Sequence, residues 1–153
     1  MNGCFIFIGE KGERKFMEVL VWKLRITVLW IILAAGCSGA QILYILAPGV
    51  INNIIVGNYE GTNIDTGFLM VFSLFWLIPL TMAFLTLVLK DKINRYANAV
   101  LGLLFGIYVI SSVSIPLSMG QEFSGHLLLE SVGIIIAFLI IWHAWKWPKK
   151  ILD

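Results

Sequence analysis

The chain alternates between long apolar runs and short polar segments. Four apolar runs stand out, at residues 24–47, 67–89, 96–117 and 126–145, and charged residues are almost absent within them. A helix rises about 1.5 Å per residue, so about 20 residues cross the roughly 30 Å hydrocarbon core of a bilayer. A helix also satisfies its backbone hydrogen bonds internally, whereas four strands would leave unpaired edges in lipid. The pattern therefore predicts an all-α, polytopic membrane protein with a bundle of four transmembrane helices.

Composition supports the same class. The 153 residues are 59% hydrophobic and 13% charged, whereas soluble domains carry about 25% charged residues. This chain could not cover a water-facing surface. We expect one transmembrane domain over residues 24–148, preceded by an N-terminal segment at 1–23 and followed by a tail at 149–153.

The distribution of positive charge predicts the orientation. All eleven Lys and Arg residues lie before or at the start of the first run, between the second and third runs, or after the fourth. The two other loops, 48–66 and 118–125, contain none and carry Glu60, Asp65 and Glu122 instead. Because basic loops stay on the cytoplasmic side, we expect a multi-pass protein of the cell membrane with both termini in the cytoplasm. This spread of basic residues follows from topology and does not favour nucleic-acid binding.

The N-terminal segment shows no signal-peptide core and no lipidation motif. The codons for Gly12 and Glu13 can spell a purine-rich ribosome-binding site, and Met17 follows shortly afterwards. We therefore expect the native start at Met17, with residues 1–16 an upstream extension.

Tryptophans gather at the end of the fourth run. Trp142, Trp145 and Trp147 lie beside Lys146. Amphipathic rings belong at the headgroup level of a bilayer, and a lysine can reach past them to water. We interpret these four residues as membrane-interface anchors, with a ligand role for the cluster as the alternative.

Small residues four positions apart predict helix contacts. Gly102 and Gly106 share a face of the third run, and Gly36 and Ala40 share a face of the first. Such pairs let helix backbones approach closely in lipid. The contacts would form either inside the bundle or between protomers, so a homodimer or a membrane-protein partner is considered alongside membrane lipids.

Polar residues concentrate near one end of the predicted bundle. Glu130 lies one turn inside the fourth run, and His126, four residues earlier, shares its helix face. Gln41, Ser111 and Ser112 lie at comparable depth in the first and third runs. An ionisable residue inside a span marks a candidate functional site, because burying its charge is costly. Two interpretations remain open: an outward-facing ligand pocket around Glu130, or a structural role in fixing helix register.

Two stretches carry a family resemblance. "DKINRYANAVLGLL", residues 91–104, and "IIWHAWKWP", residues 140–148, resemble signatures of an uncharacterised family of small prokaryotic four-helix membrane proteins. That family is remotely similar to DoxX-like proteins, and the resemblance covers about residues 24–148. It implies the four-helix architecture and brings no known activity. Family members often carry three acids within their spans. This chain has Gln41 and Leu77 at two of these positions and an acid, Glu130, only at the third. The resemblance therefore argues against a proton-coupled or cation-binding role.

The sequence favours no enzymatic chemistry. It shows no nucleophile–base pair, metal cluster or phosphate-binding loop, and His126 and His143 are about 25 Å apart along a helix, so we expect no metal and no cofactor. The preferred interpretation is a structural, accessory or lipid-interacting membrane protein. The alternative is a small-molecule binder or transporter using the pocket around Glu130. A quinone-linked accessory subunit of an oxidoreductase is a third candidate.

Overall fold

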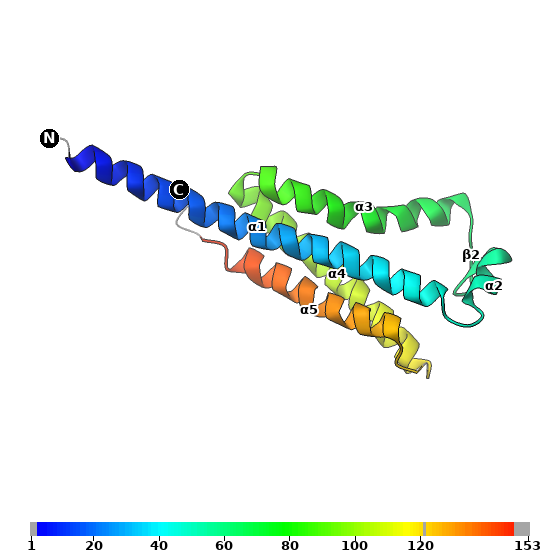
Figure 1. The fold of residues 1–153 in the computed structure, drawn as a ribbon. Helices are drawn as coiled ribbons and strands as arrows, with labels where there is room; N and C mark the ends of the chain where they lie inside the picture. The colour runs from blue at the N-terminus through cyan, green and yellow to red at the C-terminus, as the bar shows by residue number, and fades with distance from the viewer. Residues whose placement is uncertain (1–2, 121, 149–153) are drawn as a thin grey trace.

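The computed structural model describes residues 3–120 and 122–148, and most of them are helical (Figure 1). Four long helices are joined by short connections, with a small helix and a two-stranded hairpin between the first two. The elements are α1 (Gly3–Ile45), α2 (Val50–Ile55), β1 (Asn58–Tyr59), β2 (Thr62–Asn63), α3 (Thr66–Val88), α4 (Asp91–Ser118) and α5 (Gly125–Trp145). The tail at 149–153 and the first two residues of the N-terminal segment lie outside the described residues.

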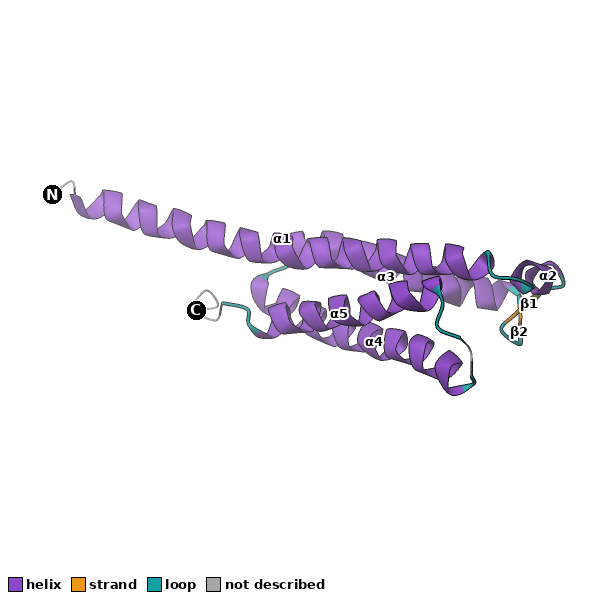
Figure 2. Ribbon diagram, turned by 60° about the horizontal axis from the view of Figure 1, so that its bottom comes forward, coloured by secondary structure: helices purple, strands orange, loops and turns teal. Residues whose placement is uncertain are grey.

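Four helices are long and apolar enough to cross a membrane, in agreement with the four expected spans. The boundaries differ by more than two residues at two places. α1 continues as one helix through residues that precede the first expected span, and its N-terminal part extends beyond the other helices (Figure 2). α4 begins at Asp91 instead of residue 96, because an acid in the first turn suits the positive end of the helix dipole. The sequence analysis also missed α2 and the hairpin, which it treated as loop.

The helices do not pack evenly. α5 packs against both α1 and α4, and α3 lies along α1, whereas the backbones of α3 and α4 approach at few positions (Figure 1). The buried core of the bundle contains Ile26, Trp30, Met82, Phe105 and Ile140. Large side chains therefore occupy the space between α3 and α4, where the backbones stand apart.

Small residues determine the close approach of α4 and α5. A Cβ on Gly102 would lie 3.1 Å from Cγ2 of Ile140, and a Cβ on Gly106 would lie 3.7 Å from Cβ of Ala137. This glycine face of α4 is thus covered by α5 within the same chain. On α1 the expected pair behaves differently: Ala40 is buried, but a Cβ on Gly36 would meet no atom within 4 Å. Gly39 is the glycine of α1 that approaches a neighbour, Leu129 of α5.

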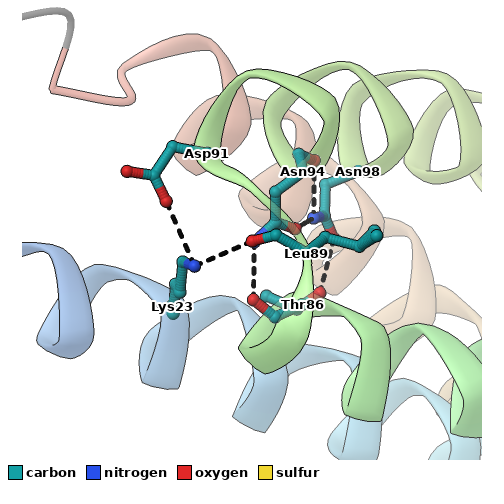
Figure 3. A network of polar contacts seen from close by, with 6 residues as sticks. All are labelled: Lys23, Thr86, Leu89, Asp91, Asn94 and Asn98. Carbon is teal, nitrogen blue, oxygen red and sulfur yellow. Dashed lines mark hydrogen bonds and ion pairs between the residues drawn. The ribbon is translucent and has the colours of Figure 1, made fainter. Parts of the chain in front are cut away.

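A buried polar network ties α1, α3 and α4 together near the α3–α4 turn (Figure 3). The Asn98 side-chain oxygen accepts from Trp30 Nε1 at 2.6 Å, and its amide nitrogen donates to the Asn94 side-chain oxygen at 2.6 Å. The Asn94 amide in turn donates to the backbone carbonyl of Thr86. Both asparagines are fully buried. Because buried amides are costly unless paired, this network fixes the relative position of the three helices.

An ion pair flanks this network at the same turn. Lys23 of α1 lies 3.1 Å from a carboxylate oxygen of Asp91 and donates to the carbonyl of Leu89 at 2.9 Å (Figure 3). The carbonyl of Leu89 lies just beyond α3, and Lys23 gives it a partner. Asn94, Asn98 and Asp91 all belong to the stretch that carries the family resemblance, and their contacts stabilise the turn.

The four expected interface anchors divide into two groups. Trp142 and Trp145 are 50% and 69% exposed, and Lys146 Nζ lies 5.2 Å from the centre of the Trp142 ring. Trp147 differs from the expectation: it is 1% exposed and packs in the core cluster with Ile26 and Trp30. Its ring is covered by protein, unlike the rings of Trp142 and Trp145.

Candidate functional site

The five polar residues singled out in the sequence line one cavity. We call it the mouth cavity, and its volume is about 270 Å³. It lies at the end of the bundle that carries α2 and the β hairpin, here called the hairpin end. Its lining residues are Gln41, Tyr44, Tyr59, Glu60, Phe72, Tyr108, Ser111, Ser112, Ile115, Pro116, His126 and Glu130.

A second cavity continues from the first toward the middle of the bundle. This deep cavity is small, about 30 Å³, which is room for about one or two water molecules, and it reaches Pro79 inside α3. It shares five lining residues with the mouth cavity, so the two cavities are adjacent. The shared residues are Gln41, Phe72, Tyr108, Ser112 and Glu130, and the deep cavity adds Ala34, Cys37, Phe75, Trp76, Pro79, Phe105 and Val109.

The hairpin covers part of the entrance. Tyr59 pairs with Thr62, and the two residues between them, Glu60 and Gly61, have φ angles of 48° and 81°. Two consecutive positive φ angles define the tight turn that suits a two-residue hairpin. Gly61 N–H donates to the Asn58 side chain at 2.8 Å, which supports the turn. This local geometry places Tyr59 and Glu60 at the cavity.

A hydrogen bond and several ring contacts attach the hairpin to the bundle. The Tyr59 hydroxyl donates to Oε1 of Gln41 at 2.8 Å. The Tyr59 ring lies 5.5 Å from Tyr44, 5.6 Å from Phe68 and 5.9 Å from Phe72, between ring centres. Burial raises the pKa of the Tyr59 hydroxyl above its ordinary value, and the neighbouring Glu60 acts in the same direction. Tyr59 therefore remains a protonated donor at neutral pH.

Aromatic rings continue along the wall. Phe75 and Tyr108 lie 4.5 Å apart between ring centres, and Phe105 contacts both. Their helices, α3 and α4, are the two whose backbones stand apart. The rings therefore line the deep cavity without filling it.

The polar wall comes from α4 and α5. The hydroxyls of Ser111 and Ser112 donate to the carbonyls of Ile107 and Val109 in their own helix, at 2.9 Å each. Ser112 is also close enough to interact with the Glu130 carboxylate. The oxygens of both serines remain available as acceptors.

His126 lies between a hydroxyl and an aromatic ring. Its Nδ1 is 2.7 Å from the hydroxyl of Ser124, the residue that precedes α5, and its ring meets Tyr44 edge-on at 5.3 Å. These contacts fix the ring at the wall of the mouth cavity. The second histidine, His143, lies against Trp22 at the opposite end of the bundle.

Acidic groups outnumber basic groups in the lining. Glu60 lies at the entrance and Glu130 where the two cavities meet, and no Lys or Arg is among the described residues that line either cavity. No group of three His, Cys, Asp or Glu side chains able to hold a metal is found among the described residues.

Sequence reasoning missed most of the aromatic lining. Tyr44 follows Gln41 by three positions and Tyr108 precedes Ser112 by four, so helical spacing alone could have placed them beside the polar residues. Tyr59 and Glu60 gave a weaker signal, because their position depends on the fold of the loop. The available sign of a turn was the pair Glu60 and Gly61, with Asn58 and Asn63 nearby.

The fold and the site define a helical protein with four membrane-spanning candidates and a polar, aromatic cavity at one end. Residues 13–153 match a family model described as "Family of unknown function (DUF6326)", and the chain belongs to this family. No curated protein matches the chain, and no solved structure does. A relationship to DoxX-like proteins is not shown by these comparisons.

Proposed function

We propose that this protein binds a small amphipathic molecule in the mouth cavity, which adjoins the deep cavity. One observation carries the proposal: side chains from α1, α3, α4, α5 and the hairpin surround an unfilled space that contains a carboxylate, a histidine and an amide among aromatic rings. Protein interiors are otherwise packed about as densely as organic crystals, and unfilled spaces are few. Ligand sites have this combination of apolar walls and a few convergent polar groups.

The proposal includes an orientation. The loops at the hairpin end contain no Lys or Arg, whereas the α3–α4 turn carries Lys90, Lys92 and Arg95. The positive-inside rule then directs both termini to the cytoplasm and the mouth cavity to the outer side of the cell membrane. A ligand would enter from outside, either to be held there or to be passed on by a transporter.

A lipid-interacting or accessory role is the second candidate. A groove between α1 and α5, at the end opposite the hairpin, is lined almost entirely by apolar side chains with Arg25 and His143 at its edge. An acyl chain with an anionic headgroup fits this description. The structural interpretation of Glu130 belongs here too, because its contact with Ser112 links α5 to α4.

A matched pair of variants tests the proposal. Ser112→Phe places a ring inside both cavities, whereas Ser114→Phe places the same ring on an exposed position of the same helix. Small molecules extracted from the purified variants would be profiled against wild type. We expect a compound enriched with wild type and with Ser114→Phe that is lost with Ser112→Phe. Identical profiles from all three folded proteins would refute the proposed binding site.

A further inference from the structure

We infer that the ligand of this cavity is a monovalent organic cation, either a protonated or a quaternary amine. The inference rests on the proposed function and adds the charge and the chemical class of the ligand. Its cationic group would lie between the carboxylates of Glu60 and Glu130, in contact with the surrounding aromatic rings, and its apolar part would pack against the apolar side chains of the mouth cavity.

The charges of the lining give the first argument. Glu60 is exposed at the entrance and Glu130 is half-buried, so the cost of desolvation concerns Glu130, and His126 is the one described lining residue that can carry a positive charge. A carboxylate removed from water is costly unless an opposite charge or several donors compensate it. A bound cation would supply that compensation, whereas a bound anion would add a third negative charge to the same space.

Aromatic rings give the second argument. Tyr44, Tyr59, Phe72 and Tyr108 all border the mouth cavity, and Tyr59 lies within 6 Å of Tyr44 and Phe72 between ring centres. A cation is attracted to the face of such rings within about 6 Å, and cages of several rings are a recurrent site for quaternary ammonium groups. Phe72, Ile115 and Pro116 add apolar lining to the mouth cavity, against which the remainder of a small cation can pack.

The turn that carries Glu60 is consistent with this role. Glu60 has a φ angle of 48°, in the left-handed region, where Gly, Asn and Asp are favoured in such a turn. A glutamate there costs backbone energy that one of these residues would reduce. The strained position keeps a carboxylate at the cavity entrance.

Cys37 provides a reporter inside the deep cavity. In a Cys4→Ser background it would be modified with two methanethiosulfonates of similar size, the cationic trimethylammonioethyl reagent and the anionic sulfonatoethyl reagent. The ratio of the two rate constants measures the charge preference of the cavity. A change in the reactivity of the thiol itself affects both reagents alike and cancels in this ratio.

We expect the cationic-to-anionic ratio to fall about tenfold in Glu130→Gln and severalfold in Glu60→Gln. Glu130→Asp retains the charge and should retain most of the ratio. Glu122→Gln is the matched control, because Glu122 is an exposed acid at the same end that lines neither cavity. A ratio that does not change in Glu130→Gln and Glu60→Gln would overturn the inference.

A protection experiment tests binding itself. Uncharged methyl methanethiosulfonate would modify Cys37 in the presence of benzyltrimethylammonium or, at the same concentration, benzenesulfonate. We expect the cation to slow the reaction in wild type but not in Glu130→Gln, and the anion to have no effect. Equal protection by both probes, or protection by neither, would overturn the cation assignment. If Ser112→Phe nevertheless loses a co-purifying molecule, the binding site stands and only the assigned charge fails.

Discussion

The hydroxyl of Tyr59 lies 2.8 Å from Oε1 of Gln41, so the β hairpin is hydrogen-bonded to α1 at the wall of the mouth cavity. The two residues are eighteen positions apart in the chain, and the bond joins a loop to a membrane-spanning helix. The Tyr59 ring also contacts Tyr44 and Phe72. The hairpin is therefore held over the cavity by one polar contact and several ring contacts.

Removing the Tyr59 hydroxyl should loosen this cover without unfolding the bundle. A neutral hydrogen bond contributes about 0.5–1.5 kcal/mol, and the ring contacts remain in Tyr59→Phe. We expect hydrogen exchange of the hairpin amides to accelerate by about three- to tenfold, while exchange in α4 and α5 stays unchanged. Tyr96→Phe, at an exposed tyrosine of α4, is the control. Unchanged hairpin exchange in Tyr59→Phe would show that the bond does not hold the cover.

Glu60→Asn should separate stability from binding. Asparagine tolerates the left-handed conformation better than glutamate does, so we expect the thermal midpoint to stay the same or rise slightly. The charge preference at Cys37 should nevertheless fall, because the entrance carboxylate is gone. Differential scanning fluorimetry and the paired-reagent labelling measure the two effects on one sample. A lowered midpoint together with an unchanged charge preference would assign Glu60 a structural role instead.

Asn98→Ala should destabilise the fold at the end remote from the cavity. The change leaves the buried indole N–H of Trp30 and the side-chain oxygen of Asn94 without a partner. Each buried group left unpaired costs about 1–3 kcal/mol. We expect a clearly lower thermal midpoint, whereas Asn53→Ala, at an exposed residue of α2, should leave it unchanged. Equal midpoints for the two variants would contradict the network's structural role.

Two glycine substitutions should have opposite effects. In Gly102→Ala the new methyl group would lie 3.1 Å from Ile140 and 3.2 Å from Ile141, so α4 and α5 must separate slightly. Overpacking of this kind costs about 1–3 kcal/mol. Gly36→Ala meets no atom within 4 Å and gains up to about 1 kcal/mol of helix propensity. We expect thermal midpoints below wild type for the first variant and at or above it for the second; the reverse order would contradict the packing described.

The long helices could be predicted from the sequence because uninterrupted apolar runs leave few alternatives in a membrane. The grouping of Glu130 with His126 followed from helical spacing. The sequence did not show which apolar face of a helix meets lipid and which meets protein, because both faces are equally apolar. Phe75 and Phe105 therefore gave no sign that they line a cavity. Trp147 resembled an interface anchor because it follows Lys146, and only the tertiary packing buries it.

The position of the cavity's second carboxylate, Glu60, also could not be predicted from the sequence. The resemblance argued against a cation site because the acids expected at Gln41 and Leu77 are missing. Glu60 lies in a loop whose fold depends on Tyr59 reaching Gln41, a contact between residues far apart in the chain. Once the hairpin is formed, Glu60 joins Glu130 in lining the mouth cavity. The buried pair Asn94 and Asn98 gave a clearer signal, since two amides four positions apart in a membrane helix require partners.

Native mass spectrometry of wild type, released from a mild detergent beside Ser112→Phe, tests the central claim most directly. The account predicts one small cationic adduct per chain in wild type and its loss in Ser112→Phe, with the oligomeric state unchanged. Bare protein in both spectra would contradict a ligand site at Glu130 and leave that residue as a contact between α4 and α5.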